Sequence, residues 1–243
     1  MIRHVLGHLG RLLAVLALAV LCLQLWFAAR IALMNWIAPQ STSFQRSEAV
    51  RLLKEKQQVA WSQAWVDDAQ LPKTLKRAVI ASEDDGFAEH GGVDWDALKG
   101  AWQKNEKAQA RAEARKAKKP PKVIGGSTIT QQLAKNLFLS GERTLLRKGQ
   151  ELILTLMLEA MLDKRRILEI YLNSVEWGEG LFGAQAAARH YFRMDVSRLG
   201  AFEAARLAVM LPAPKRFERQ PGSAYVIGRA SLIVGRMNSA QTP

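Results

Sequence analysis

The sequence has a single cysteine, Cys22, among 243 residues, so the chain can form neither an internal disulfide bond nor a cysteine-based zinc site. Its four histidines, His4, His8, His90 and His190, are scattered along the chain, which argues against a protein-held metal cage. Acidic residues are also scarce: 35 lysines and arginines outnumber 22 aspartates and glutamates, for a formal net charge of +13. This imbalance indicates an anionic partner, which could be nucleic acid, a membrane surface or a phosphate-bearing substrate.

Charged residues are absent between Leu12 and Ala29, where Gln24 is the only polar side chain. An apolar run of about 18 to 20 residues is long enough to cross a bilayer. A cleaved signal peptide is the alternative interpretation. However, no clear small-x-small cleavage site closes the run, and Trp26 and Trp36 are typical of anchors at a membrane interface. We therefore expect an uncleaved signal anchor.

The positions of the basic residues predict the topology of this anchor. Arg3 and Arg11 precede the span, and positive charge is usually retained in the cytoplasm. We expect residues 1–10 to form a cytoplasmic tail, residues 11–38 the transmembrane segment and residues 39–243 a domain outside the cytoplasm. In a bacterium this would be a single-pass protein of the inner membrane with its domain on the periplasmic side.

The rest of the chain predicts a mainly α domain. Apolar residues recur at helical spacing, no stretch alternates convincingly over a strand's length, and there is no internal repeat. Residues 104–122 hold eight lysines and arginines against two glutamates and include Pro120-Pro121. We expect this stretch to be an exposed basic arm that continues as a flexible connector. Aromatic residues for base stacking are missing from its later half, which argues against nucleic-acid binding. Binding of anionic lipid headgroups, or a charged surface that simply faces water, is the better interpretation of its charge.

An acidic triplet, Glu83 to Asp85, follows an apolar helical run and precedes the turn-rich steps Asp85-Gly86 and His90-Gly91-Gly92. A carboxylate at such a junction can be held by packed neighbours while it faces a cleft, as a general base requires. Glu83 is therefore a candidate base, although a solvated helix end has the same appearance.

Two further helices carry candidate ligand-binding side chains. The first is expected to begin after Gly125-Gly126 with Ser127 as its N-cap, and one of its faces groups Thr128, Gln131, Gln132 and Lys135. Hydroxyl, amide and ammonium groups without a carboxylate suit an anionic or sugar-phosphate ligand. An ordinary amphipathic surface helix is the alternative.

The second helix is expected over residues 142–164. Arg143, Arg147 and Glu151 form a column at a spacing of four residues, and Lys148 lies three residues before Glu151. Because residues 152–161 are almost wholly apolar, we expect this helix to run through the core. Charges at the end of a buried helix are costly unless they meet a ligand or one another. A simple Arg147–Glu151 ion pair is the less specific interpretation.

Five groups of residues occur in an order that resembles the peptidoglycan glycosyltransferases of glycosyltransferase family 51. They are Glu83-Asp-x-x-Phe87-x-x-His90-x-Gly; Gly126-Ser-Thr-Ile-Thr-Gln-Gln-Leu-x-Lys-Asn136; Arg147-Lys-x-x-Glu151; Ile167-Leu-Glu-x-Tyr-Leu-Asn173 with the glycines that follow; and Glu203-Ala-x-x-Leu-Ala208. The resemblance covers residues 71–217 and implies a lysozyme-like, two-lobed helical domain. Ser-x-x-Lys and Lys-Thr-Gly motifs of a transpeptidase are absent from the sequence, so it looks like the stand-alone type.

The resemblance also implies a reaction. The substrate would be lipid II, and the enzyme would join the 4-hydroxyl of its N-acetylglucosamine to the anomeric carbon of the growing strand, with inversion and loss of polyprenyl pyrophosphate. The implied catalytic carboxylates are Glu83, as the base, and Glu151. The implied substrate-binding residues are Ser127, Gln131, Gln132, Lys135, Arg143, Arg147 and Lys148, and Asp84 with His90 would brace the loop. No metal ligands are implied among these residues, although a divalent cation such as Mg²⁺ or Mn²⁺ could bridge the pyrophosphate.

The expected partners are lipid II, the nascent glycan strand, membrane lipid and other cell-wall synthesis proteins, with no nucleic acid. Two rival functions remain at this point. A lysozyme-like hydrolase also uses a catalytic glutamate in a helical domain, but it needs no cationic leaving-group site. A membrane-anchored binding protein without activity would leave the ordered motifs unexplained.

Overall fold

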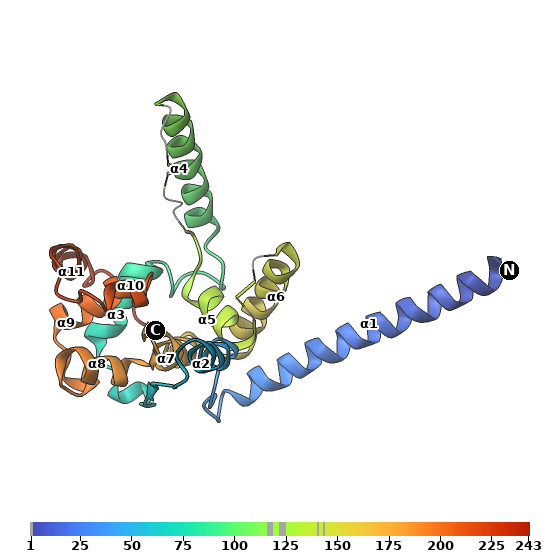
Figure 1. Cartoon of the computed structure of the whole chain (residues 1–243), viewed down its shortest axis with the longest axis horizontal. Helices are drawn as coiled ribbons and strands as arrows, with labels where there is room; N and C mark the ends of the chain where they lie inside the picture. The colour runs from blue at the N-terminus through green and yellow to red at the C-terminus, as the bar shows by residue number, and fades with distance from the viewer. Residues whose placement is uncertain (1, 116–118, 122–124, 140, 143) are drawn as a thin grey trace.

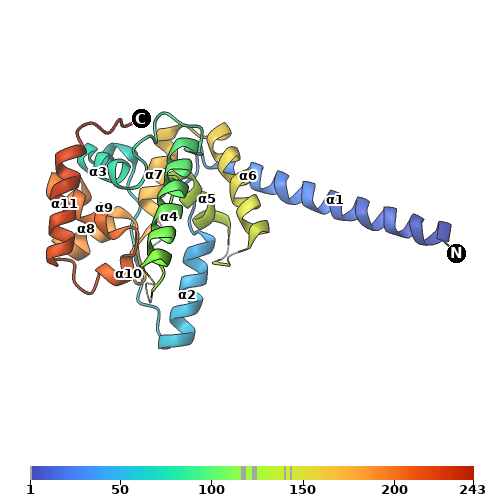
Figure 2. The ribbon, with the colours of Figure 1, turned by 90° about the horizontal axis from the view of Figure 1, so that it is seen from above.

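The computed structural model describes the whole chain except residues 1, 116–118, 122–124, 140 and 143. A long N-terminal helix, α1 (Ile2–Leu33), projects from the body of the protein (Figures 1 and 2). Residues 8–33 of α1 are long and apolar enough to cross a membrane, and most of their side chains are exposed rather than packed on the domain. The helix also includes positions 2–10, so the expected cytoplasmic tail continues the helix of the span.

The body is mainly helical, as predicted. Its elements in chain order are α2 (Ser43–Lys56), β1 (Ser62–Gln63), η1 (Asp68–Gln70), α3 (Lys73–Glu83), α4 (Trp95–Ala114), α5 (Ile129–Phe138), α6 (Leu145–Met161), α7 (Lys164–Ser174), β2 (Glu176–Gly178), β3 (Leu181–Phe182), α8 (Ala184–Phe192), η2 (Val196–Arg198), α9 (Ala201–Met210), α10 (Pro214–Phe217) and α11 (Ala224–Arg236). They form two lobes. In one, α3, α9 and α11 pack on each other; in the other, α5 packs against α2, α6 and α7.

Helix α3 carries Glu83 at its last position and is held by the first lobe. Pro72 precedes the helix, as the sequence suggested, and Leu75, Val79 and Ile80 are completely buried against the neighbouring helices. Each such side chain contributes roughly 1.5–3 kcal/mol when it leaves water. The carboxylate at the end of α3 therefore stands on a rigid support.

Helix α5 is amphipathic in the predicted sense, with Ile129, Leu133 and Leu137 buried. The predicted N-cap was wrong. Thr128, not Ser127, caps the helix, because its hydroxyl accepts from the backbone N–H of Gln131 while the Gln131 side chain accepts from the backbone N–H of Thr128. This reciprocal pair requires the partner to stand three positions after the cap, whereas Gln131 stands four positions after Ser127.

The expected helix over residues 142–164 was too long, and its burial was misjudged. Thr144 caps α6, and the next helix begins only after Asp163, whose carboxylate caps α7. One face of α6 is buried, but Leu152, Ile153 and Leu156 are 36–51% exposed. The apolar composition therefore reflects an outward-facing surface as well as a core contact.

Helix α6 also contacts the membrane-type helix α1. Gln24 exchanges hydrogen bonds of 2.9 and 3.1 Å with Gln150, and the Asn35 side chain donates to the Met161 carbonyl at 3.0 Å. The paired amides explain how Gln24, the one polar side chain of the apolar run, is accommodated.

A small sheet was not predicted. Strand β3 lies between β1, which is parallel to it, and β2, which is antiparallel. Strands of two or three residues are too short to show an alternating pattern. By contrast, residues 184–192, 199–211 and 225–237 carry apolar side chains at helical spacing, and these stretches form α8, α9 and α11 to within about two residues.

Helix α4 stands away from both lobes (Figure 1). Asp94 caps it, accepting from the Ala97 N–H at 2.8 Å, and the residues from Lys104 to Arg115 are mostly exposed. The first half of the basic arm is thus an exposed helix, whereas part of its second half falls outside the described residues.

Candidate active site

Glu83 is held by a short chain of hydrogen bonds that links three helices. The Gln132 side chain on α5 donates to the Glu83 carboxylate at 3.1 Å, and the Tyr171 hydroxyl on α7 donates to the Gln132 carbonyl oxygen at 2.9 Å. Tyr171 is completely buried, so its hydroxyl needs such a partner. The contact with Tyr171 fixes which end of the Gln132 amide faces Glu83.

Burial raises the pKa of the Glu83 carboxyl above its ordinary value. The hydrogen bond from Gln132 opposes this shift, while the neighbouring negative charge of Asp84 reinforces it. A carboxylate with a raised pKa is a stronger base than one in water, which suits the removal of a proton from a hydroxyl group.

Asp84 and His90 join the loop after α3 to the start of α5. The buried Asp84 carboxylate accepts from the Ile129 N–H at 2.9 Å and contacts His90 Nε2 at 2.8 Å. His90 Nδ1 accepts from the Gly92 N–H at 3.1 Å, which assigns the proton to Nε2 and makes it the donor to Asp84. Through these contacts the two side chains hold the loop against the start of α5.

Gly92 has a positive φ of 92°, which disfavours any residue with a Cβ. A Cβ there would lie 2.8 Å from side-chain atoms of Thr155 and Glu159 on α6. The Gly92 carbonyl also accepts from the Thr128 hydroxyl at 2.6 Å. The loop after Glu83 is therefore fastened to both α5 and α6.

A cleft of about 340 Å³ lies along α5 and the beginning of α6, and we call it the cationic cleft. Its described lining includes Phe44, Ser127, Gln131, Gln132, Lys135, Asn136, Leu139, Glu142, Arg147, Lys148 and Glu151. All the predicted substrate-binding residues except Arg143 thus meet around one cleft. Arg143 lies outside the described residues.

Glu151 is only 4% exposed and is paired with two cations. Arg147 donates to one carboxylate oxygen at 3.0 Å, and the Lys148 ammonium donates to the other. Arg147 and Glu151 of the predicted column therefore form an ion-pair cluster with Lys148 on the wall of the cleft. A buried carboxylate without these partners would be costly, so the three side chains hold one another in place.

Lys135 faces the same cluster from α5. Its side chain is exposed overall, but its ammonium lies close to protein atoms, and this partial burial lowers the pKa of Lys135. Glu151 opposes the shift, and the nearby charges of Arg147 and Lys148 add to it. The cleft thus holds three cations, Lys135, Arg147 and Lys148, around one buried carboxylate, that of Glu151. This excess of positive charge over Glu151 favours an anionic ligand.

Glu83 lines a second, adjoining hollow, which we call the acidic hollow. Its described lining also contains Asp84, Asp85, Asp94, Asp96, Lys104 and Arg236. Ser127 lines both spaces, and Gln132, which lines the cationic cleft, donates to Glu83. A substrate could therefore reach Glu83 from one side and the cations from the other.

The described residues contain no cluster of three or more histidine, cysteine, aspartate or glutamate side chains suited to a metal ion. Within the cationic cleft both oxygens of Glu151 are already paired with cations. These side chains do not fit a metal ion held by the protein, so we assign no step to one.

Sequence reasoning missed two residues of this site. Tyr171 belongs to a motif noted above, and a tyrosine in an apolar helix signals a buried hydroxyl that requires a partner. Phe44 lies in a polar stretch with no recognised pattern, and only the tertiary structure brings it to the cleft. The two candidate carboxylates, by contrast, were both identified from the sequence, Glu83 from its position at a helix end and Glu151 through the family resemblance.

A helical domain on an apolar helix, with carboxylates beside a cationic cleft, is the architecture of an enzyme for an anionic, membrane-held substrate. The sequence model of the family described as transglycosylase matches residues 50–238, and the chain belongs to this family. It is 53% identical to a biosynthetic peptidoglycan transglycosylase of Burkholderia lata over 95% of this chain and 89% of that protein. The protein of the same description from Paraburkholderia phytofirmans is 49% identical over 95% of this chain and 91% of its own length.

Membership in this family makes the chain a glycosyltransferase, as its motifs predicted, and confirms the lysozyme-like helical fold. It disfavours both rival functions, the hydrolase and the binding protein without activity.

Proposed function

We propose that the protein polymerises peptidoglycan by transferring the growing lipid-linked glycan strand onto the 4-hydroxyl of the N-acetylglucosamine of lipid II. The anomeric centre inverts, and polyprenyl pyrophosphate leaves. The observation that carries this proposal is the arrangement along α5, where Gln132 contacts Glu83 on one side and Lys135 approaches the Arg147–Lys148–Glu151 cluster on the other.

In this proposal Glu83 is the general base. It takes the proton of the acceptor hydroxyl as the oxygen attacks the anomeric carbon of the donor. The acceptor would occupy the acidic hollow, which Glu83 lines, and the donor would occupy the cationic cleft. The raised pKa of Glu83 supports this role, because base strength increases with pKa.

The cations of the cleft stabilise the leaving group. Negative charge develops on the pyrophosphate as the glycosidic bond breaks, and fixed positive charges at that place lower the barrier. Lys135, Arg147 and Lys148 supply them, with Arg143 as a further candidate from the sequence. Glu151 positions Arg147 and Lys148 through its two ion pairs. Ser127, Gln131 and Gln132 would hold sugar or phosphate groups of the donor.

The membrane anchor gives the substrate a direct route to the site. Lipid II stays in the bilayer, so a tethered enzyme meets it in two dimensions and in one orientation. The exposed apolar face of α6, next to α1, supports a cleft that opens at the membrane surface. We place α1 in the inner membrane and the domain in the periplasm, where the nascent strand and other wall-synthesis proteins are its expected partners.

The decisive test is polymerisation of purified lipid II by the full-length protein and by Glu83→Gln, with products separated by size on gels. The substitution keeps the shape and removes the base, so we expect the rate to fall about 10²–10⁴-fold while lipid II binding is retained. A near-normal rate in the variant would move the base elsewhere, with Glu151 the next candidate.

The stability of the variant provides a control. The folded-state pKa of Glu83 is raised, so the protein has its full stability below the unfolded-state pKa of this carboxyl. It loses stability as the pH rises through the folded-state pKa, because Glu83 must then be ionised while buried. Glu83→Gln should therefore unfold at the same temperature as the wild type or higher at neutral pH. Inactivity with a lower unfolding temperature would point to damage of the fold. No polymer from the wild type would refute the proposed function itself.

A further inference from the structure

Helix α2 supplies a wall of the cationic cleft that the family motifs do not include. Phe44, in the first turn of α2, lines the cleft together with Gln131, Asn136 and Glu151, and it precedes the residues 50–238 that match the family. Its ring is partly buried and packs edge-to-face near Phe182 on β3, with ring centroids 6.1 Å apart. An aromatic ring therefore borders the proposed donor position.

The position of this ring is fixed by the start of α2. Thr42 and Gln45 form a reciprocal capping box, in which Thr42 accepts from the Gln45 N–H at 3.0 Å and the Gln45 side chain accepts from the Thr42 N–H at 2.9 Å. Both side chains are 1% exposed. A helix end whose caps are buried and hydrogen-bonded to the backbone has little freedom to fray, so Phe44, which lies between them, is held still.

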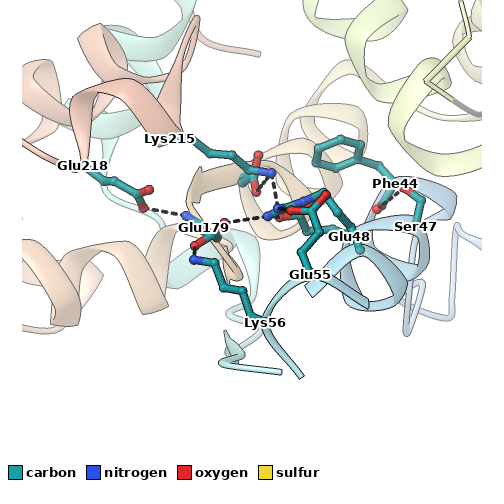
Figure 3. A network of polar contacts seen from close by, with 10 residues as sticks. Phe44, Ser47, Glu48, Glu55, Lys56, Glu179, Lys215 and Glu218 are labelled. Atoms are coloured by element: carbon teal, nitrogen blue, oxygen red, sulfur yellow. Dashed lines mark hydrogen bonds and ion pairs between the residues drawn. The ribbon is translucent and has the colours of Figure 1, made fainter. Parts of the chain in front are cut away.

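One turn further along, a network of ion pairs fastens α2 to α10 and to the turn after β2 (Figure 3). Glu48, which is 4% exposed, accepts from Arg51 at 2.6 and 2.9 Å and from Lys215 on α10 at 2.6 Å. Arg51 also donates to Glu179, in the turn after β2, at 2.6 Å. The backbone N–H of Glu179 in turn donates to Glu218 at 2.6 Å.

This network stands four residues after Phe44, on the same side of the helix, because positions i and i+4 share a face. Glu48 is buried, so separating it from Arg51 and Lys215 would leave a buried carboxylate without its cationic partners, which is unfavourable. The network therefore holds α2 against the body and keeps Phe44 at the cleft. A rigidly held aromatic side chain is what a binding site requires of a contact surface.

The other side chains of the cleft indicate what Phe44 contacts. Among the described lining, Phe44 and Leu139 are the only large apolar side chains, and the rest are amides, a hydroxyl and charged groups. A polyprenyl chain needs a continuous apolar lining, which is not present here. A pyranose ring needs hydrogen-bonding groups around its hydroxyls and an apolar surface for its C–H face, and the electron-rich face of an aromatic ring provides the latter.

We propose that Phe44 is a substrate-binding residue whose ring packs against the C–H face of a sugar of the donor strand, and that the Glu48–Arg51–Lys215 network positions it. This inference rests on the proposed function and assigns a sugar contact to a residue outside the family match. The contact would orient the donor sugar toward the acceptor hydroxyl near Glu83.

The test compares substitutions that separate aromatic character from apolar bulk. Phe44→Leu keeps an apolar side chain that can pack near Phe182, whereas Phe44→Trp keeps an aromatic face. An aromatic contact is worth about 0.5–1.5 kcal/mol, so kcat/KM for lipid II polymerisation should fall about 2–12-fold in Phe44→Leu and be largely retained in Phe44→Trp. Val50→Ala, at an exposed position of the same helix, is the matched control and should behave as the wild type.

A second measurement distinguishes the sugar from the lipid. Undecaprenyl pyrophosphate has the lipid and phosphates of the donor but no sugar, so its inhibition constant should be the same for the wild type and Phe44→Leu. Weaker inhibition of Phe44→Leu, by the same factor as the loss of kcat/KM, would assign the ring to the lipid and overturn the proposal.

Two kinetic results would also overturn it. Wild-type kcat/KM in Phe44→Leu would reduce Phe44 to a packing residue, and an equal loss in Phe44→Trp with an unchanged unfolding temperature would remove the need for an aromatic face. In each case the wild-type enzyme still polymerises lipid II, so this failure is distinct from failure of the proposed function.

Discussion

Asp84 offers the sharpest test of how the site is assembled, because one carboxylate connects the end of α3 to the start of α5. Replacing it in Asp84→Ala leaves the Ile129 N–H, in a completely buried residue, without its acceptor. It also removes the partner of His90. An unsatisfied buried donor costs about 1–3 kcal/mol, and the loss of an anion at a helix N-terminus adds about 0.3–1 kcal/mol.

Part of this loss is offset. Burial raises the pKa of Asp84, which means that holding its charge inside the protein is itself unfavourable. We therefore expect a net loss of about 2 kcal/mol in the free energy of unfolding. For a protein of this size that lowers the unfolding temperature by about 4–8 °C.

The same substitution should impair activity, because Glu83 and Gln132 lie on the two helices that Asp84 connects. A displacement of about 1 Å at the reacting groups can cost up to about 10²-fold in rate. We expect at least a roughly tenfold slower polymerisation of lipid II, measured at a temperature where the variant remains folded. Thermal unfolding by circular dichroism gives the stability.

Asp85→Ala is the matched control for this experiment. Asp85 is the adjacent carboxylate, it is exposed, and its replacement should change stability by less than about 0.5 kcal/mol. If Asp84→Ala matched Asp85→Ala in both unfolding temperature and polymerisation rate, the connection between the two helices would not depend on this carboxylate and the reasoning would be refuted.

Two further predictions concern the base and the topology. In Gln132→Met the Glu83 carboxylate loses a hydrogen bond that lowers its pKa, so the acidic limb of the pH–rate profile should move to higher pH; an unchanged limb, or one at lower pH, would contradict the role of Glu83 as the base. With the proposed periplasmic domain, Ser47→Cys, at an exposed position of α2, should react with a membrane-impermeant thiol reagent in intact spheroplasts; labelling only after lysis would reverse the orientation.

The sequence by itself determined the helical class of the domain and the identity of its candidate catalytic side chains. The spacing of apolar residues located α3 and α5. Burial of these apolar faces stabilises each helix, whichever neighbour it packs against. Glu83 could be selected because it stands at the end of such a helix, and Glu151 because its motif resembles that of the glycosyltransferase family. Local patterns were less reliable at helix ends, where the choice between Ser127 and Thr128 as cap depended on a side-chain contact with Gln131.

Only the tertiary structure decided how these pieces meet. It showed that Gln132 links Tyr171 to Glu83, that one side of the apolar helix α6 faces outward, and that Phe44 reaches a cleft formed by residues about 80 to 110 positions further along the chain. The physical reason is that a periodic pattern specifies which face of a helix is buried but not which neighbour buries it. That neighbour is selected by packing and by paired polar groups, such as the Glu48–Lys215 bond, that come from distant parts of the sequence.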